Sequence, residues 1–168
     1  MTELFKLLTI SQYTAALRTL EQSIDACDDD TWAAEHIDGT VSQVVFHTLF
    51  YSDLYLEREE KGFKEQAFHR ENQGFFQDYE EAENRPPVNF YERSKCRDYL
   101  GHCFRKARDV MQTESEESLG GASGFHWRNT TRAENHIYNI RHIQHHAAQL
   151  GLRNQLRGGA PLKWIGQG

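Results

Sequence analysis

The chain has 168 residues, enough to bury a substantial hydrophobic core, and we expect residues 1–168 to form a single domain. Its 25 acidic and 19 basic residues give a net charge of −6 without a Lys- or Arg-rich run, which argues against nucleic acid or an anionic membrane as a partner. No apolar run approaches the roughly 18 residues of a membrane span, and the first residues lack a signal-peptide pattern, so we expect a cytoplasmic protein.

Two helical patterns come first along the chain. Apolar side chains recur at steps of three and four from Ile10 to Cys27, which predicts a helix with one buried face. An acidic run follows and ends this pattern. The second helix is expected to start at Thr40, because Gln43 three residues later completes a capping box, and to fade near Gly62.

A long connection separates the second helix from the third. No helical period holds over residues 61–84, which are rich in Glu, Gln, Lys and aromatic side chains, and the sequence does not predict their conformation. A connection of this length is usually functional or partly disordered. The third helix is expected to begin with a cap at Asn89, after two prolines, and to continue to about Met111.

The fourth helix is expected after a linker rich in Ser, Gly and Glu. It should run from about residue 130 to Leu156, and Gly158 and Gly159 should end it. No segment shows the alternation of apolar and polar residues that is typical of a strand. The predicted fold is therefore all-α, a four-helix bundle with a long connection between the second and third helices.

Histidines on the second and fourth helices suggest a metal site. His142 and His146 are four residues apart and lie on the same helical face, whereas His145 is turned roughly 100° away from His146. His47 shares its side of the second helix with Tyr51 and should point inward. Three neutral imidazole nitrogens would leave a fourth coordination position open, which is typical of a catalytic zinc site.

Two other interpretations of these histidines exist. A chain with nine histidines places two of them four apart by chance fairly often, so they could be structural. A di-iron carboxylate site needs Glu-x-x-His on two helices, but the residues three before His142 and His47 are Asn139 and Val44.

A helical wheel places His142 and His146 in a polar strip beside the apolar stripe. His47 also lies on a flank, which predicts a polar pocket near one end of the bundle.

Candidate substrate contacts are few. Tyr51, Asp53 and Tyr55 follow His47, and we take Tyr51 as the first candidate, although a hydrogen-bonded structural role is the simpler one. Trp127 could close over the site or act as a hydrophobic plug. Arg153 could attract a substrate carboxylate or be a solvated cation at the helix end. No residue is singled out as a general base, and the catalytic residues stay unknown.

Two stretches resemble a known family. TVSQVVFHTLFYSD at 40–53 and NHIYNIRHIQHHAAQLGLR at 135–153 resemble the DinB-like superfamily, which includes bacillithiol and mycothiol transferase-like proteins. That family has one histidine on its second helix and HxxxH on its fourth, and these positions fall on His47, His142 and His146. The helix order and the long connection also fit, so the resemblance covers most of the chain.

The resemblance implies a four-helix bundle, commonly homodimeric, that binds a divalent ion such as zinc or nickel. Better-understood members transfer a low-molecular-weight thiol to an electrophile or isomerise a thiol adduct. We therefore expect a metal-dependent enzyme acting on a small-molecule substrate. It would be a thiol S-transferase, which could take such a thiol as cosubstrate, or a hydrolase that activates water. A metal-binding or stress-response module without turnover and a helical interaction protein are the alternatives.

Overall fold

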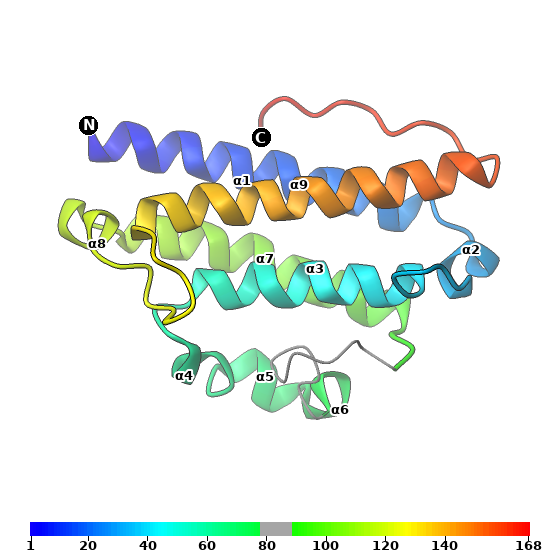
Figure 1. Cartoon of the computed structure of the whole chain (residues 1–168), viewed down its shortest axis with the longest axis horizontal. Helices are drawn as coiled ribbons and strands as arrows, with labels where there is room; N and C mark the ends of the chain where they lie inside the picture. The colour runs from blue at the N-terminus through cyan, green and yellow to red at the C-terminus, as the bar shows by residue number, and fades with distance from the viewer. Residues whose placement is uncertain (78–88) are drawn as a thin grey trace.

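The computed structural model describes residues 1–77 and 89–168, and this part of the chain is helical without any β-strand (Figure 1). The all-α prediction is confirmed. The long helices are α1 (Thr2–Asp25), α3 (Val41–Leu56), α7 (Arg93–Thr113) and α9 (Arg132–Leu156). The short helices are α2 (Asp29–Ala33), α4 (Glu60–Phe63), α5 (Ala67–Glu71), α6 (Gln73–Phe76) and α8 (Glu116–Gly120). Not one of the described helices has the length and apolar character needed to cross a membrane.

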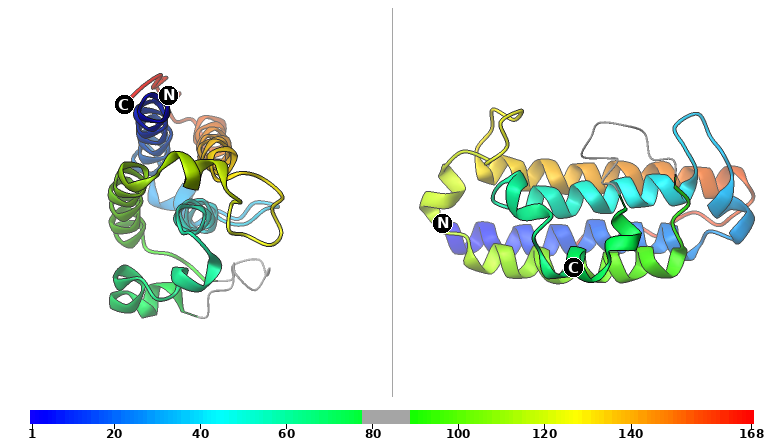
Figure 2. Two further views of the ribbon diagram at one scale, coloured as in Figure 1. Left: turned by 90° about the vertical axis from the view of Figure 1, so that its left-hand side faces the viewer. Right: turned by 90° about the horizontal axis from the view of Figure 1, so that it is seen from below.

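The four long helices lie side by side, as the end view in Figure 2 shows. Each packs against two of the others: α1 and α3 both contact α7 and α9. Helices α1 and α9 run in the same direction, because Tyr13 contacts His136 and Ser23 contacts Ala147 further along both helices. Helices α3 and α7 run in the opposite direction (Figure 1).

The starts and ends of the helices follow local hydrogen bonding. The predicted capping box is present: the Thr40 side chain accepts from the Gln43 amide, and the Gln43 side chain accepts from the Thr40 amide. Helix α9 ends at Leu156 as predicted, and Gly158 follows in the left-handed region with φ of 92°. Helix α7 begins at Arg93, so the predicted cap at Asn89 lies in an irregular segment before it.

Arg132 ties the start of α9 to the end of α3. Its guanidinium, 1 % exposed, donates to the carbonyls of Tyr55, Leu56 and Glu57 at 2.9, 2.7 and 2.6 Å. These carbonyls have no partner within their own helix, because a helix ends there. The Nε–H of Arg132 donates to Glu114 at 3.0 Å, which balances the buried charge.

The connection after α3 runs along the outside of α3 and α7 (Figure 1). Helix α3 ends at Leu56, earlier than predicted, and the described part of the connection contains the short helices α4, α5 and α6. Buried Asp53 anchors it, because Oδ2 lies 2.7 Å from Nε2 of His69 in α5 and Oδ1 pairs with Lys106 of α7. Residues 78–84 of the predicted connection lie outside the described residues.

Candidate metal centre

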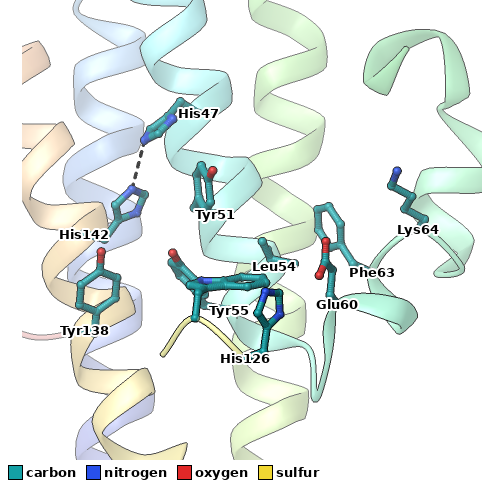
Figure 3. Close-up of a pocket in the computed structure, with 11 residues that line it drawn as sticks. His47, Tyr51, Leu54, Tyr55, Glu60, Phe63, Lys64, His126, Tyr138 and His142 are labelled. Atoms are coloured by element: carbon teal, nitrogen blue, oxygen red, sulfur yellow. Dashed lines mark hydrogen bonds between the residues drawn. The ribbon is translucent and has the colours of Figure 1, made fainter. Parts of the chain in front are cut away.

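Three histidines meet where α3 packs against α9. His47 lies near the middle of α3, and His142 and His146 lie one turn apart near the middle of α9, not near one end of the helices as the wheel predicted. One ring nitrogen of each lies within 4.8 Å of the others, so this cluster could hold a metal ion. Nε2 of His47 and Nε2 of His142 are 3.4 Å apart (Figure 3). His145 is exposed and lies outside the cluster.

The polar strip of α9 aims the two histidines of that helix at α3. Asn135 and Asn139 of the strip are fully buried, and their amides donate to backbone carbonyls of α3, each at 2.9 Å. His142 and His146 continue the strip by steps of three and four. The strip is thus a buried contact between two helices, and it directs both rings toward His47.

Burial keeps two of the three rings neutral. It lowers the pKa of His142 from 6.5 to about 2, and the neighbouring histidines act in the same direction. Burial also lowers the pKa of His146 to about 4, although a hydrogen bond to Gln149 opposes the shift. Near pH 7 each ring therefore has one nitrogen with a free lone pair, and this is the form of histidine that binds metal.

His142 offers its ring nitrogens few competing partners. Nδ1 of His142 is buried and has no hydrogen-bond partner in the described part of the chain. The 3.4 Å separation between His142 and His47 is longer than the roughly 2.7–3.2 Å of an ordinary hydrogen bond. Three imidazole nitrogens are a sufficient donor set for a divalent ion that keeps a further position for water or substrate. The residues therefore fit a divalent metal ion.

A cavity of about 650 Å³ opens beside His47 and His142. Its apolar wall is made by Tyr51, Leu54, Tyr55, Phe63, Trp127 and Tyr138. Figure 3 shows the three tyrosines next to the histidine pair, with Glu60, Phe63 and Lys64 farther away on the connection after α3. This arrangement can bind a small molecule with an apolar or aromatic body next to the ring nitrogens.

Three of the candidate substrate contacts line this cavity: Tyr51, Tyr55 and Trp127. Tyr51 lies beside His47, with 4.9 Å between the ring centroids, and Trp127 is 45 % exposed at the rim. Tyr138 was not predicted, although it lies four residues before His142 and the helical period could have indicated it. Phe63 is the last residue of the short helix α4 in the connection after α3, and no sequence pattern pointed to it.

Two other candidates for substrate contact lie away from the cavity. Arg153 is 7 % exposed, pairs with Asp38 and is not part of the cavity wall. Its expected role in holding a substrate carboxylate stays a prediction. Asp53 is fully buried among Lys106, His69 and other donors. A buried charge is stable only with such partners, so Asp53 has a structural environment.

Comparison with known proteins adds no relative: no family model, no curated protein and no solved structure matches this chain. The DinB-like resemblance therefore stays a prediction, which rests on the motif positions at His47, His142 and His146.

Proposed function

We propose that the chain is a metal-dependent enzyme in which His47, His142 and His146 bind one divalent ion beside an aromatic pocket. The observation that carries the proposal is the convergence of three ring nitrogens next to a cavity of about 650 Å³. Zinc or nickel would suit a set of three imidazole ligands.

We also propose that the chain belongs to the DinB-like family and folds as its four-helix bundle. Helices α1, α3, α7 and α9 would form this bundle. Residues 57–92 would be the long connection between its second and third helices. The order and directions of the long helices support this assignment, as do the histidine positions on α3 and α9. A homodimer, which the resemblance implies, belongs to this proposal as well.

A bound ion would act as a Lewis acid and lower the pKa of a thiol or a water molecule at the site. The protein would supply the remaining functions. Buried Asn135 and Asn139 hold α9 against α3, which keeps the histidine rings in place. The aromatic wall would bind the apolar body of the substrate and exclude water from it. Glu60 and Lys64 would face its polar end.

A metal-binding protein without turnover is the second candidate. The cavity favours an enzyme, because a storage or sensing site has no need for an aromatic chamber beside its ligands. Thiol transfer and hydrolysis both fit three nitrogen ligands, since zinc accepts thiolate as well as water. The identity of the nucleophile is therefore a question for an activity screen.

Metal content is the first test. Elemental analysis of the purified protein should find about one zinc or nickel per chain. His142→Ala should lose the metal, because only two ring nitrogens remain, whereas His145→Ala should keep it. Equal loss from both variants, or wild-type protein without metal that also fails to take up added zinc, would reject the site.

Activity is the second test. Metal-loaded protein is given small thiols with an aromatic electrophile such as 1-chloro-2,4-dinitrobenzene, and separately an aryl ester for hydrolysis. We expect turnover in one of these assays, with His142→Ala inactive and His145→Ala active. Stoichiometric metal without turnover across a broad panel of both substrate classes would favour the non-catalytic candidate.

A further inference from the structure

His146 is linked to the loop before α3 by a series of hydrogen bonds. Its Nδ1 lies 2.9 Å from Oε1 of Gln149, one turn further along α9. The amide nitrogen of Gln149 donates to Oδ2 of Asp38, in the loop between α2 and α3. Oδ1 of Asp38 pairs with Arg153, whose guanidinium also donates to the carbonyl of Gly39 at 3.3 Å. In contrast, Nδ1 of His142 has no partner in the described part of the chain.

The direction of each hydrogen bond in this series follows from Asp38, the carboxylate to which the series leads. A carboxylate only accepts, so the Gln149 group that faces Asp38 must be the amide nitrogen. The amide oxygen of Gln149 then faces His146 and can only accept. Nδ1 of His146 must therefore carry the ring proton, which leaves the lone pair on Nε2.

We infer that Asp38 and Gln149 are positioning residues that fix the tautomer and orientation of His146 as a metal ligand. This inference rests on the proposed metal site. If the Gln149 amide turned over, its NH₂ group would face Nδ1, and the proton would move to Nε2. A protonated Nε2 cannot bind a metal ion. Ligating histidines commonly donate their second nitrogen to such a partner, and loss of that partner lowers metal affinity.

The fold holds Asp38 in place for this role. Gly39 has φ of 99°, a left-handed conformation, and its amide donates to the carbonyl of His36 at 3.1 Å, which makes a tight turn. Arg153 lies one turn beyond Gln149 on α9 and pairs with Asp38 from that side. Arg153, which the sequence also suggested as a substrate contact, holds Asp38 in this arrangement.

The ring tautomer can be measured without metal or activity. Long-range ¹H–¹⁵N correlation of the metal-free protein at pH 8 distinguishes protonation at Nδ1 from protonation at Nε2. We expect Nδ1–H at His146 in the wild type, and a gain of the Nε2–H form in Asp38→Ala and in Gln149→Leu. A purely structural role for Asp38 would change the melting temperature but not the tautomer.

Zinc affinity is the second readout, by competition with a chromophoric chelator. Asp38→Ala and Gln149→Leu should each bind zinc about 10–100-fold more weakly than the wild type. The matched controls are Asp30→Ala, an exposed aspartate of α2, and Gln144→Leu, a glutamine of α9 outside the series. Both controls should keep wild-type affinity.

Exchanging the carboxylate of Asp38 and the amide of Gln149 should restore zinc binding. In Asp38→Asn combined with Gln149→Glu, the introduced carboxylate accepts from both neighbours, so His146 keeps its proton on Nδ1. Zinc affinity of this double variant should return toward the wild-type value, while Gln149→Glu alone sets two carboxylates face to face and should not.

Wild-type protein with Nε2–H at His146, or unchanged tautomer and affinity in Asp38→Ala and Gln149→Leu, would overturn the inference. Wild-type protein that shows Nδ1–H but binds no zinc would instead reject the proposed function, and with it the role in metal binding.

Discussion

Lowering the pH should destabilise the metal-free protein through His142. Its pKa is about 2 in the folded protein, against about 6.5 in an unfolded chain. Between these values the unfolded chain binds a proton that the folded protein does not, so the free energy of unfolding falls as the pH drops below 6.5. Each pH unit in this range costs about 1.4 kcal/mol, which gives a loss of about 2 kcal/mol from pH 7 to pH 5.

Urea unfolding of the metal-free wild type and of His142→Gln at both pH values measures this difference. The variant lacks the titrating ring, so its stability should fall by about 2 kcal/mol less than that of the wild type. Burial also lowers the pKa of His69, His136 and His146, but all three residues are present in the two proteins and their effects cancel. Parallel loss of stability in the two proteins would refute the assignment of this proton to His142.

Three further outcomes are expected. Zinc at 100 times its Kd should raise the free energy of unfolding of the wild type by about 2.7 kcal/mol and leave His142→Ala unchanged, as followed by thermal unfolding with and without EDTA. Trp127→Ala should weaken the binding of an aromatic ligand about 2–10-fold through loss of a ring contact, with unchanged metal content, whereas Trp164→Ala, also exposed, should not. Lys106→Met should destabilise the fold by about 3–5 kcal/mol in urea, because Asp53 then stays buried without its charge partner; little or no change would mean that the pair is not needed.

The periodicity of apolar residues predicted the long helices, but their ends depend on contacts that periodicity does not describe. Helix α1 starts at Thr2, before the predicted pattern, and its first turns expose Leu4 and Leu7 rather than showing one buried face. Helix α3 ends at Leu56, where Arg132 from a distant part of the chain donates hydrogen bonds to the last carbonyls of the helix. Short helices of four or five residues contain about one turn, so no periodicity can reveal them.

The site was predictable where it depends on one helix and not where it depends on packing. The four-residue spacing selected His142 and His146 and excluded His145, because helical geometry is local. The partner of Gln149 could not be predicted, because Asp38 lies 111 residues away in a loop. Phe63 likewise reaches the cavity from a connection whose conformation has no sequence signal.

The meeting of His47 with His142 follows from how Arg132 holds α3. His142 lies ten residues after Arg132, about 15 Å along α9 at 1.5 Å per residue. His47 lies nine residues before Leu56, about 14 Å back along α3. Because the helices run in opposite directions from the contact of Arg132 with the Leu56 carbonyl, both histidines reach nearly the same height. Arg132, three residues before Asn135 of the polar strip, therefore sets where along the bundle His142 meets His47.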